Sequence, residues 1–414
     1  MGFHHPYPIP EPRMPEQIGL TDLFVMGMIS PFLNSTDQES FWEKFELPYR
    51  IEALLNFGCN LVMSIGNSET VAESLAKIPF MVSFDLYLNE TSNFADIVLP
   101  DCSYLQSYDS RSNFPFIFGH PAGLGEWCWP IRQPVLPPDA DQRRCADVLL
   151  EIAHRAGFGD EVNAAYNAMM GLEPPYRLEP GENSSYEEIC DRDLKNNFGA
   201  DKGLDWFRKN GVVKWPKKVE EVYWRHFVDV RVPIYWEFLV SLGEKTEAIT
   251  APRGLTIPRE YYEPMPDFIP CKSHGCTTPE FDFTGFYYRD TIHTNSYTME
   301  NPWLDETAQL DPFSYAIAIN AETGRKKGLR NGQLVWVENE NGRKVKGRIK
   351  LTQGIHPEGL GIGACAGHWS DGMPVAKGKG VFYNELLEVD WEHSSPVNLN
   401  LDLCVRVKVT PVES

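Results

Sequence analysis

The sequence predicts a mixed fold: a parallel α/β domain, then an irregular insertion, then an all-β barrel domain. Three observations support this. Short apolar runs at 60–64, 80–84 and 96–99 surround a helical segment, which is typical of buried parallel strands. From about residue 283, apolar residues recur with a period of two, as in strands that bury one face. The stretch 160–270 shows neither period clearly and is rich in proline and aromatic residues, so we expect an irregular, partly helical insertion there.

The length of 414 residues suggests two or three domains, which we place at 1–160, 161–282 and 283–414. The net charge of −20 makes a nucleic-acid partner unexpected, because neutralising phosphates requires clustered Lys and Arg. No run of 18 apolar residues occurs, so we expect no membrane insertion. Residues 1–16 resemble neither a secretory nor a twin-arginine signal.

The nine cysteines argue against a disulfide scaffold and against a standard zinc or iron–sulfur site. Their number is odd, and no pair has the CxxC spacing. Cys271 and Cys276 lie close together in the sequence, but a loop with free thiols is favoured over a metal site there. We therefore predict no metal ligand on this chain.

Two features of the predicted α/β domain suggest a ligand site. Gly66, Asn67 and Ser68 form a turn, and Ser68 or Asn67 can cap a helix that runs to about Lys77. A helix N-terminus favours phosphate. No GxGxxG is present, so an ordinary strand-to-helix turn remains the alternative. Asp85 ends the strand at 80–84, where ligands bind in open α/β sheets and where a carboxylate can accept hydrogen bonds from a guanine or a ribose. The alternative for Asp85 is a capping or turn carboxylate.

Further elements follow from local signals. A helix is predicted at 142–156, with one apolar stripe and Gly157 at its left-handed stop. In the β-domain, Asn341-Gly342 is a strong hairpin signal and Asn331-Gly332 marks another turn. The predicted strands there, which would form a small closed β-domain, are 315–319, 333–337, 343–351 and 403–409.

Short polar residues gather just before the β-domain, where His293, Asn295 and Ser296 could donate to phosphate oxygens. His368 and Asn398 follow later, although a lone histidine is more often structural than functional. No nucleophile–base constellation, P-loop or HExxH helix is present, so no catalytic residue is predicted.

Taken in order, these segments resemble the C-terminal half of the dimethyl sulfoxide reductase family of molybdopterin enzymes. Residues 85–100 resemble the family's D-x-F-x-T-E-T-A-x-x-A-D-I-V-L-P segment, with Asn89 and Ser92 as departures. The runs at 293–306 and 319–335 are similar to the family's dinucleotide-binding β-domain, and 367–369 and 397–398 match more loosely. The resemblance covers nearly the whole chain and is weakest at 160–270.

The resemblance implies a bis-molybdopterin guanine dinucleotide cofactor holding molybdenum or tungsten. It implies that the first domain binds one nucleotide, mainly through Asp85 and the turn at 66–68. It also implies that the last domain is a six-stranded double-psi barrel contacting pterins and phosphates. From its irregular, aromatic-rich composition, we predict that 160–270 lines a substrate funnel and forms no independent domain. The cofactor-binding candidates are Gly66, Asn67, Ser68, Asp85, Thr91, Asp96, His293, Asn295, Ser296, Asn320, His368 and Asn398.

In such enzymes the N-terminal half carries the metal ligand and any iron–sulfur cysteines, and neither is found in this sequence. We therefore expect this chain to be a fragment or one piece of a split subunit, inactive alone, with the N-terminal half as its partner. An iron–sulfur electron-transfer subunit is a further candidate partner. Any twin-arginine signal would lie on the N-terminal half, so periplasmic and cytoplasmic locations both stay open.

The function implied is electron or oxygen-atom transfer by an oxidoreductase, in anaerobic respiration. The run at 293–304 is nearest to the branch that reduces sulfur and arsenic oxyanions, and an organic substrate is also open. Two alternatives remain. One is a non-redox hydratase or hydroxytransferase, or a dehydroxylase, on the same cofactor. The other is a non-catalytic half-subunit that binds or helps to assemble the cofactor.

Overall fold

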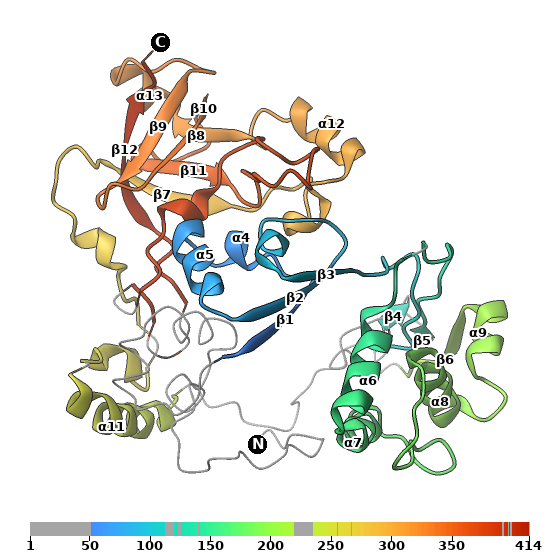
Figure 1. The fold of residues 1–414 in the computed structure, drawn as a ribbon. Coiled ribbons are helices and arrows are strands. Elements are labelled where there is room, and N and C mark those ends of the chain that lie inside the picture. The colour runs from blue at the N-terminus through green and yellow to red at the C-terminus, as the bar shows by residue number, and fades with distance from the viewer. Residues whose placement is uncertain are drawn as a thin grey trace. The chain divides into compact units, whose positions relative to one another are not determined.

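The structure is a computed structural model. It describes residues 51–111, 120–122, 126–139, 141–218, 235–254, 256–265, 267–390, 393–395, 397 and 400–413. The chain divides into two compact units (Figure 1). One is formed by described residues from 99 to 218, and the other by those from 51 to 98 and from 235 onward. The sequence-based division at 160 and 282 remains a prediction.

The second unit begins with a three-stranded sheet in the order β1 (Ala53–Phe57), β2 (Phe80–Asp85) and β3 (Ile97–Pro100). Strands β1 and β2 are parallel, as expected for a parallel sheet, but β1 takes the place of the strand predicted at 60–64. Helices α4 (Leu61–Ser64) and α5 (Ser68–Ala76) lie between them in the chain, and apolar side chains of both helices pack against β2.

The run 60–64 was wrongly predicted to be a strand, because it forms helix α4 and the strand lies upstream in β1. Leu61, Val62 and Met63 are all buried, and a short run buried all round has no period that separates helix from strand. A contact with a distant segment favours the helix, because the Val62 N–H donates to the Thr91 hydroxyl at 3.0 Å.

Six described strands of the second unit form a closed barrel, which confirms the predicted closed β-domain. They are β7 (Phe283–Tyr288), β8 (Ala316–Asn320), β9 (Leu334–Asn339), β10 (Lys344–Thr352), β11 (Gly359–Gly363) and β12 (Val405–Pro411), closed in the order β10-β8-β11-β7-β12-β9. The pairs β10–β8 and β11–β7 are parallel, and the other four are antiparallel. Phe283, Ile317, Val337, Leu360 and Val407 lie in its core.

The hairpin predicted from Asn341-Gly342 is found between β9 and β10. Gly342 has the left-handed φ of 86° that this turn requires. Strand β11 was not predicted, because three of its five residues are glycine, a residue depleted in strands. All five are buried, and a Cβ on Gly361 would lie 3.2 Å from the Tyr288 ring. Helices α12 (Pro302–Leu310) and α13 (Ala321–Lys326) flank the barrel strands in the chain.

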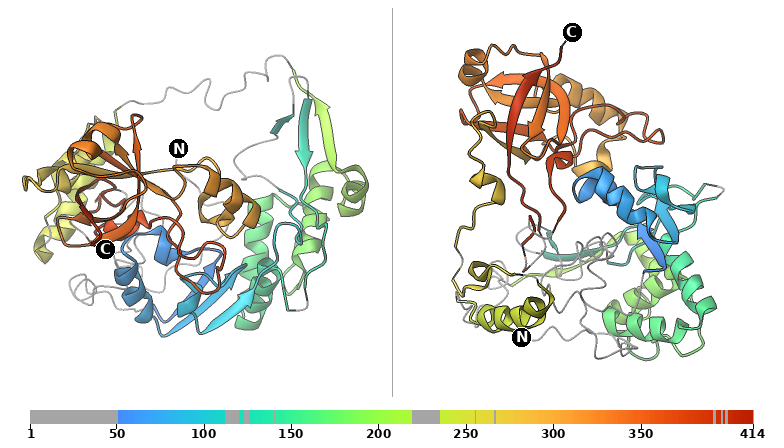
Figure 2. Two further views of the ribbon diagram at one scale, coloured as in Figure 1. Left: turned by 90° about the horizontal axis from the view of Figure 1, so that it is seen from above. Right: turned by 60° about the vertical axis from the view of Figure 1, so that its left-hand side comes forward.

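The first unit combines helices with a small antiparallel sheet, which Figure 2 shows from two sides. Its helices are α6 (Cys145–Ala156), α7 (Gly159–Met170), α8 (Tyr186–Phe198) and α9 (Leu204–Asn210), and its strands are β4 (His120–Ala122), β5 (Glu126–Pro130) and β6 (Val212–Pro216). Gly157 stops α6 with φ 87°, as predicted.

The stretch 160–270 was predicted to be an irregular, partly helical insertion, and the structure describes its helices. Helices α7 to α9 run through it, and in the second unit it also holds α11 (Phe238–Thr250). A capping box of Ser185 and Glu188 starts α8, and this signal was present in the sequence. None of the helices that the structure describes is long and apolar enough to cross a membrane.

Candidate functional site

The candidate site centres on Glu90, a carboxylate with no exposed surface. Its Oε2 accepts hydrogen bonds from Asn60 Nδ2 at 2.7 Å and from His368 Nδ1 at 3.0 Å. Its Oε1 accepts from the backbone N–H groups of Trp369 at 2.7 Å and Ser370 at 3.0 Å. Glu90 therefore joins the α/β segment to the loop after β11, 278 residues away in the sequence.

Two glycines let this loop, residues 364–372, reach Glu90. Gly367 has φ 88°, and a Cβ there would lie 2.4 Å from the Phe382 backbone nitrogen. Gly372 pairs with Leu88 in an isolated bridge, and a Cβ on it would lie 2.3 Å from the Leu88 carbonyl oxygen. The loop thus packs backbone against backbone, which only glycine allows.

The Glu90 carboxylate determines that Nδ1 of His368 carries a proton. Burial acts to raise the pKa of Glu90, but hydrogen bonds from His368, Ser370 and Asn60 outweigh it and lower the pKa to about 2. Because the carboxylate is ionised and can only accept, His368 Nδ1 carries a proton and donates it to Glu90. His368 Nε2 is buried, and no described residue lies within hydrogen-bond reach of it.

The turn at 66–68 is built by contacts within the chain. Of the two predicted caps, Ser68 and Asn67, it is Asn67 that caps α5, by accepting from the Thr70 N–H at 3.1 Å. A Cβ on Gly66 would lie 2.6 Å from Val389, so close packing requires the glycine. The Ser68 N–H and hydroxyl both donate to Glu385, at 3.1 and 2.5 Å, so a carboxylate of the chain already occupies the anion position at the α5 N-terminus.

The three carboxylate and hydroxyl candidates around β2 also have partners. Half-buried Asp85 accepts from the Leu86 N–H at 2.8 Å and from Asn89 Nδ2 at 2.5 Å. Thr91 is fully buried, and its hydroxyl donates to Asn60 Oδ1 at 2.9 Å. Exposed Asp96 accepts from the Met81 N–H at 2.7 Å, which places the start of β3 beside β2.

The candidates near the barrel differ in exposure. His293 is buried beside Thr298 and Tyr315. Asn295 is exposed, has φ 51°, and accepts from Arg289 at 2.7 Å. Ser296 is half-buried, buried Asn320 caps α13, and Asn398 lies outside the described residues. The structure thus brings Thr91 and His368 together around Glu90, and the roles of all twelve candidates as cofactor ligands remain predictions.

Sequence reasoning missed Glu90, Asn60 and Glu385. Glu90 lies inside the most specific motif, but a buried role for it depends on donors far away in the sequence. Glu385 had no local signal, because its partner Ser68 is 317 residues away. Glu90 is flanked by Asn89, Thr91 and Ser92, so no local apolar pattern marks it as a buried charge.

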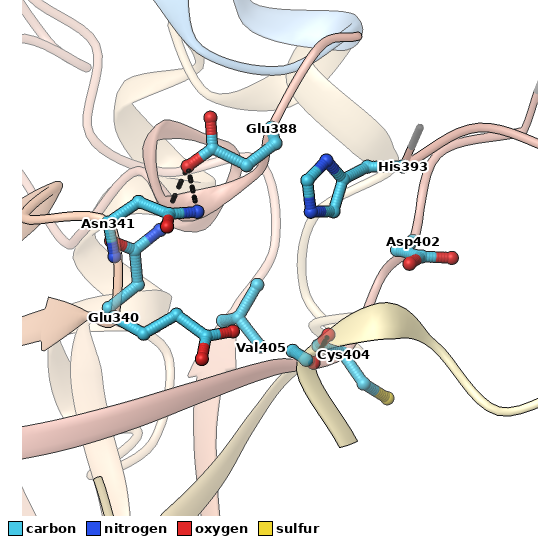
Figure 3. Close-up of a pocket in the computed structure, with 9 residues that line it drawn as sticks. Glu340, Asn341, Glu388, His393, Asp402, Cys404 and Val405 are labelled. Atoms are coloured by element: carbon cyan, nitrogen blue, oxygen red, sulfur yellow. Dashed lines mark hydrogen bonds between the residues drawn. The ribbon is translucent and has the colours of Figure 1, made fainter. Parts of the chain in front are cut away.

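A separate small pocket lies beside the β9–β10 turn and includes Glu340, His393 and Asp402 (Figure 3). In it the Asn341 amide donates to Glu388 at 2.9 Å. Hydrogen bonding to Asp390 raises the pKa of His393 against the effect of burial. No predicted site residue lines this pocket, and no group of three or more His, Cys, Asp or Glu that could hold a metal ion is found in the described part of the chain.

Comparison with known proteins finds a family match over most of the barrel region. Residues 284–397 match the family described as the molydopterin dinucleotide binding domain. A tetrathionate reductase chain of Archaeoglobus fulgidus is 30% identical over 403 residues, covering 82% of this chain and 35% of the relative. A sulfite dehydrogenase chain of Allochromatium vinosum is 24% identical over 377 residues, covering 78% of this chain and 37% of the relative.

The chain is a homologue of dimethyl sulfoxide reductase-family molybdopterin subunits. This confirms the resemblance read from the sequence. Among solved structures, acetylene hydratase from Pelobacter acetylenicus matches with a TM-score of 0.56 and 15% identity, covering 90% of this chain and 46% of that one, which supports the family's fold. The chain spans well under half the length of these curated relatives.

The residues present suit a molybdopterin dinucleotide, judged by the buried polar atoms that need a partner. His368 Nε2, Asn67 Nδ2 and Ser314 Oγ are buried and have no hydrogen-bond partner among the described residues. A buried polar group without a partner costs about 1–3 kcal/mol, so a ligand atom that bonded one of these three would be stabilised. Pterin and phosphate groups supply many matching oxygen and nitrogen atoms.

Proposed function

We propose that this chain holds part of a bis-molybdopterin guanine dinucleotide with molybdenum or tungsten, as the C-terminal portion of an oxidoreductase catalytic subunit. The observation that carries the proposal is the buried Nε2 of His368, which has no partner in the described part of the chain and lies within the matched dinucleotide-binding domain. Bound there, the cofactor would supply electron or oxygen-atom transfer, and the chain would orient it.

The roles of individual residues follow from their contacts. His368, held by Glu90, would hydrogen-bond the cofactor through Nε2. Asp85 would accept from a guanine edge, after exchanging its present partner Asn89. We propose that the barrel is of the double-psi type, supported by its six strands and two parallel pairs, and that residues 160–270 line the substrate funnel.

For the substrate class we propose a sulfur or arsenic oxyanion. Relatives named for thiosulfate, tetrathionate and arsenate reduction support this choice. Acetylene hydratase, which is a relative at 23% identity and a structural neighbour, supports non-redox chemistry as a second candidate. A relative named as a molybdopterin-binding-like subunit of menaquinone reductase supports a non-catalytic role as a third. Metal analysis of the native complex, with dye-linked reduction of each oxyanion, separates the three.

Asp85→Ala is expected to weaken retention of the guanine dinucleotide. The change removes charge-assisted hydrogen bonds typically worth about 1.5–3 kcal/mol each, so retention should fall at least tenfold. Cofactor content per folded protein measures the effect in the complex with the N-terminal half. Glu322→Ala, at an exposed carboxylate, is the matched control. Equal retention by Asp85→Ala and the wild type would remove Asp85 from the site.

The isolated chain is expected to be inactive and to self-associate. Large apolar side chains are exposed around β1 to β3, and we propose that the N-terminal half covers them, since the chain spans well under half of its relatives' length. The exposed side chains are Leu55, Phe57, Phe80, Leu86, Tyr87, Leu88, Phe94 and Ile97. Adding the N-terminal half should abolish association and raise Tm by linkage, as light scattering and calorimetry would show. A stable, metal-loaded and active monomer of this chain alone would contradict the proposal.

A further inference from the structure

A connected set of polar side chains surrounds His293, and the directions of its hydrogen bonds can be worked out. Nδ1 of His293 lies 3.3 Å from the Thr298 hydroxyl, and Nε2 lies 3.4 Å from the Tyr315 hydroxyl. The Tyr315 hydroxyl lies 2.9 Å from Asp305 Oδ1. Asp305 Oδ2 accepts from Gln309 at 2.7 Å and forms an ion pair with Lys379.

The carboxylate of Asp305 is ionised and can only accept hydrogen bonds, so it sets the direction of the other hydrogen bonds in this network. Burial acts to raise its pKa, but hydrogen bonds from Lys379, Tyr315 and Gln309 outweigh it, and the pKa is lowered. An ionised carboxylate can only accept, so the single Tyr315 proton points to Asp305. Burial and this hydrogen bond both raise the pKa of Tyr315, so the phenol keeps its proton.

The direction of the Tyr315 hydrogen bond determines which nitrogen of His293 carries a hydrogen. With its proton committed to Asp305, the Tyr315 oxygen can only accept from His293, so Nε2 must carry a hydrogen. The neutral ring then presents a lone pair at Nδ1, which the Thr298 hydroxyl can satisfy as a donor. That same hydroxyl oxygen accepts the Thr294 N–H at 2.9 Å, so the chain of hydrogen bonds ends on the backbone of the loop.

We propose that Tyr315 is a positioning residue that holds His293 in the Nε2–H tautomer and presets the loop 293–298 before any ligand arrives. Both ring nitrogens of His293 are engaged within the chain, whereas His368 Nε2 finds no partner among the described residues. His293 therefore acts through the shape of its loop and His368 through direct contact. The network joins this loop to α12, to the start of β8 and to Lys379, so it fixes three segments at once.

Nitrogen-15 NMR of the histidine-labelled full chain tests the proposal without any cofactor. At a pH of about 8, above the ordinary histidine pKa, the spectrum distinguishes the two neutral tautomers. The His293 signal, assigned by its loss in His293→Gln, should show hydrogen on Nε2 in the wild type. In Tyr315→Phe the Nδ1–H form should rise by roughly threefold to tenfold, the range that one neutral hydrogen bond provides.

Two variants control for general effects. Tyr288→Phe also removes a phenol hydroxyl from the second unit, but that hydroxyl donates to the Phe313 carbonyl, so the His293 tautomer should not change. Thr298→Val should keep Nε2–H, because Asp305 and Tyr315 alone impose that direction. Hydrogen exchange of a peptide spanning 293–298 should become at least threefold faster in Tyr315→Phe, and should stay unchanged in Tyr288→Phe. An Nδ1–H wild type, or a Tyr315→Phe spectrum and exchange rate equal to the wild type's, would overturn the proposal.

Discussion

Glu90→Ala is expected to lower the free energy of unfolding by several kcal/mol, since each buried donor left without an acceptor costs about 1–3 kcal/mol. The change leaves Asn60 Nδ2, His368 Nδ1 and two backbone N–H groups without their common acceptor. Asn60, His368 and Ser370 are buried, so their donors would lose a hydrogen bond without access to bulk water, whereas Trp369 is exposed. Urea denaturation followed by tryptophan fluorescence measures the loss, and Trp369 reports on this region.

Glu90→Gln is the sharper variant, because it keeps the volume but turns one acceptor oxygen into a donor group. We expect a large part of the alanine effect to remain, since an NH₂ group would then face other donors. Glu322→Gln, at an exposed salt bridge to Lys326, should leave the unfolding midpoint unchanged. A Glu90→Gln protein as stable as the wild type would show that Glu90 does not hold the two segments together.

The same carboxylate predicts how stability depends on pH. Its pKa is lowered from 4.5 to about 2 in the folded chain, which corresponds to about 3 kcal/mol at 1.36 kcal/mol per pKa unit. A lowered carboxyl pKa stabilises the fold above the unfolded value. This contribution is therefore complete above about pH 4.5 and is lost as the pH falls toward 2. Glu90→Gln should flatten that part of the pH–stability curve.

Gly367→Ala is expected to be destabilising by about 2–5 kcal/mol and to reduce cofactor retention together with stability. Two costs add here. The left-handed conformation at φ 88° costs an alanine about 1–2 kcal/mol, and the new Cβ would lie 2.4 Å from the Phe382 nitrogen. Backbone atoms cannot rotate away, so the loop must move, and with it the three donors that His368, Trp369 and Ser370 give to Glu90.

Gly342→Ala separates the two costs. Gly342 has nearly the same φ, 86°, but no atom lies within 4 Å of a Cβ placed there. It should therefore show the conformational cost alone, about 1–2 kcal/mol, with cofactor retention unchanged. Equal effects of Gly342→Ala and Gly367→Ala on stability and retention would mean that the close contact with Phe382 is not what holds the loop.

The sequence by itself determined the features that depend on near neighbours in the chain. Asn67 as a helix cap, Gly157 as a helix stop and Asn341-Gly342 as a hairpin turn were all predicted and found. Each depends on backbone groups only a few residues away, so the local sequence holds all the information needed. The family resemblance was also available from one specific run, residues 85–100, and the comparisons confirm it.

Tertiary structure alone decided what the polar groups at the site do. Residues 60–64 became a helix, and Ser68 received Glu385 as its anion, because partners 29 and 317 residues away satisfy their polar groups. Glu90 acquired its role from a loop 278 residues further on. A buried charge must be paired, but the sequence does not say which distant donors the fold will bring to it. The same long-range pairing settled that His293 has both ring nitrogens engaged, while Nε2 of His368 has no partner among the described residues.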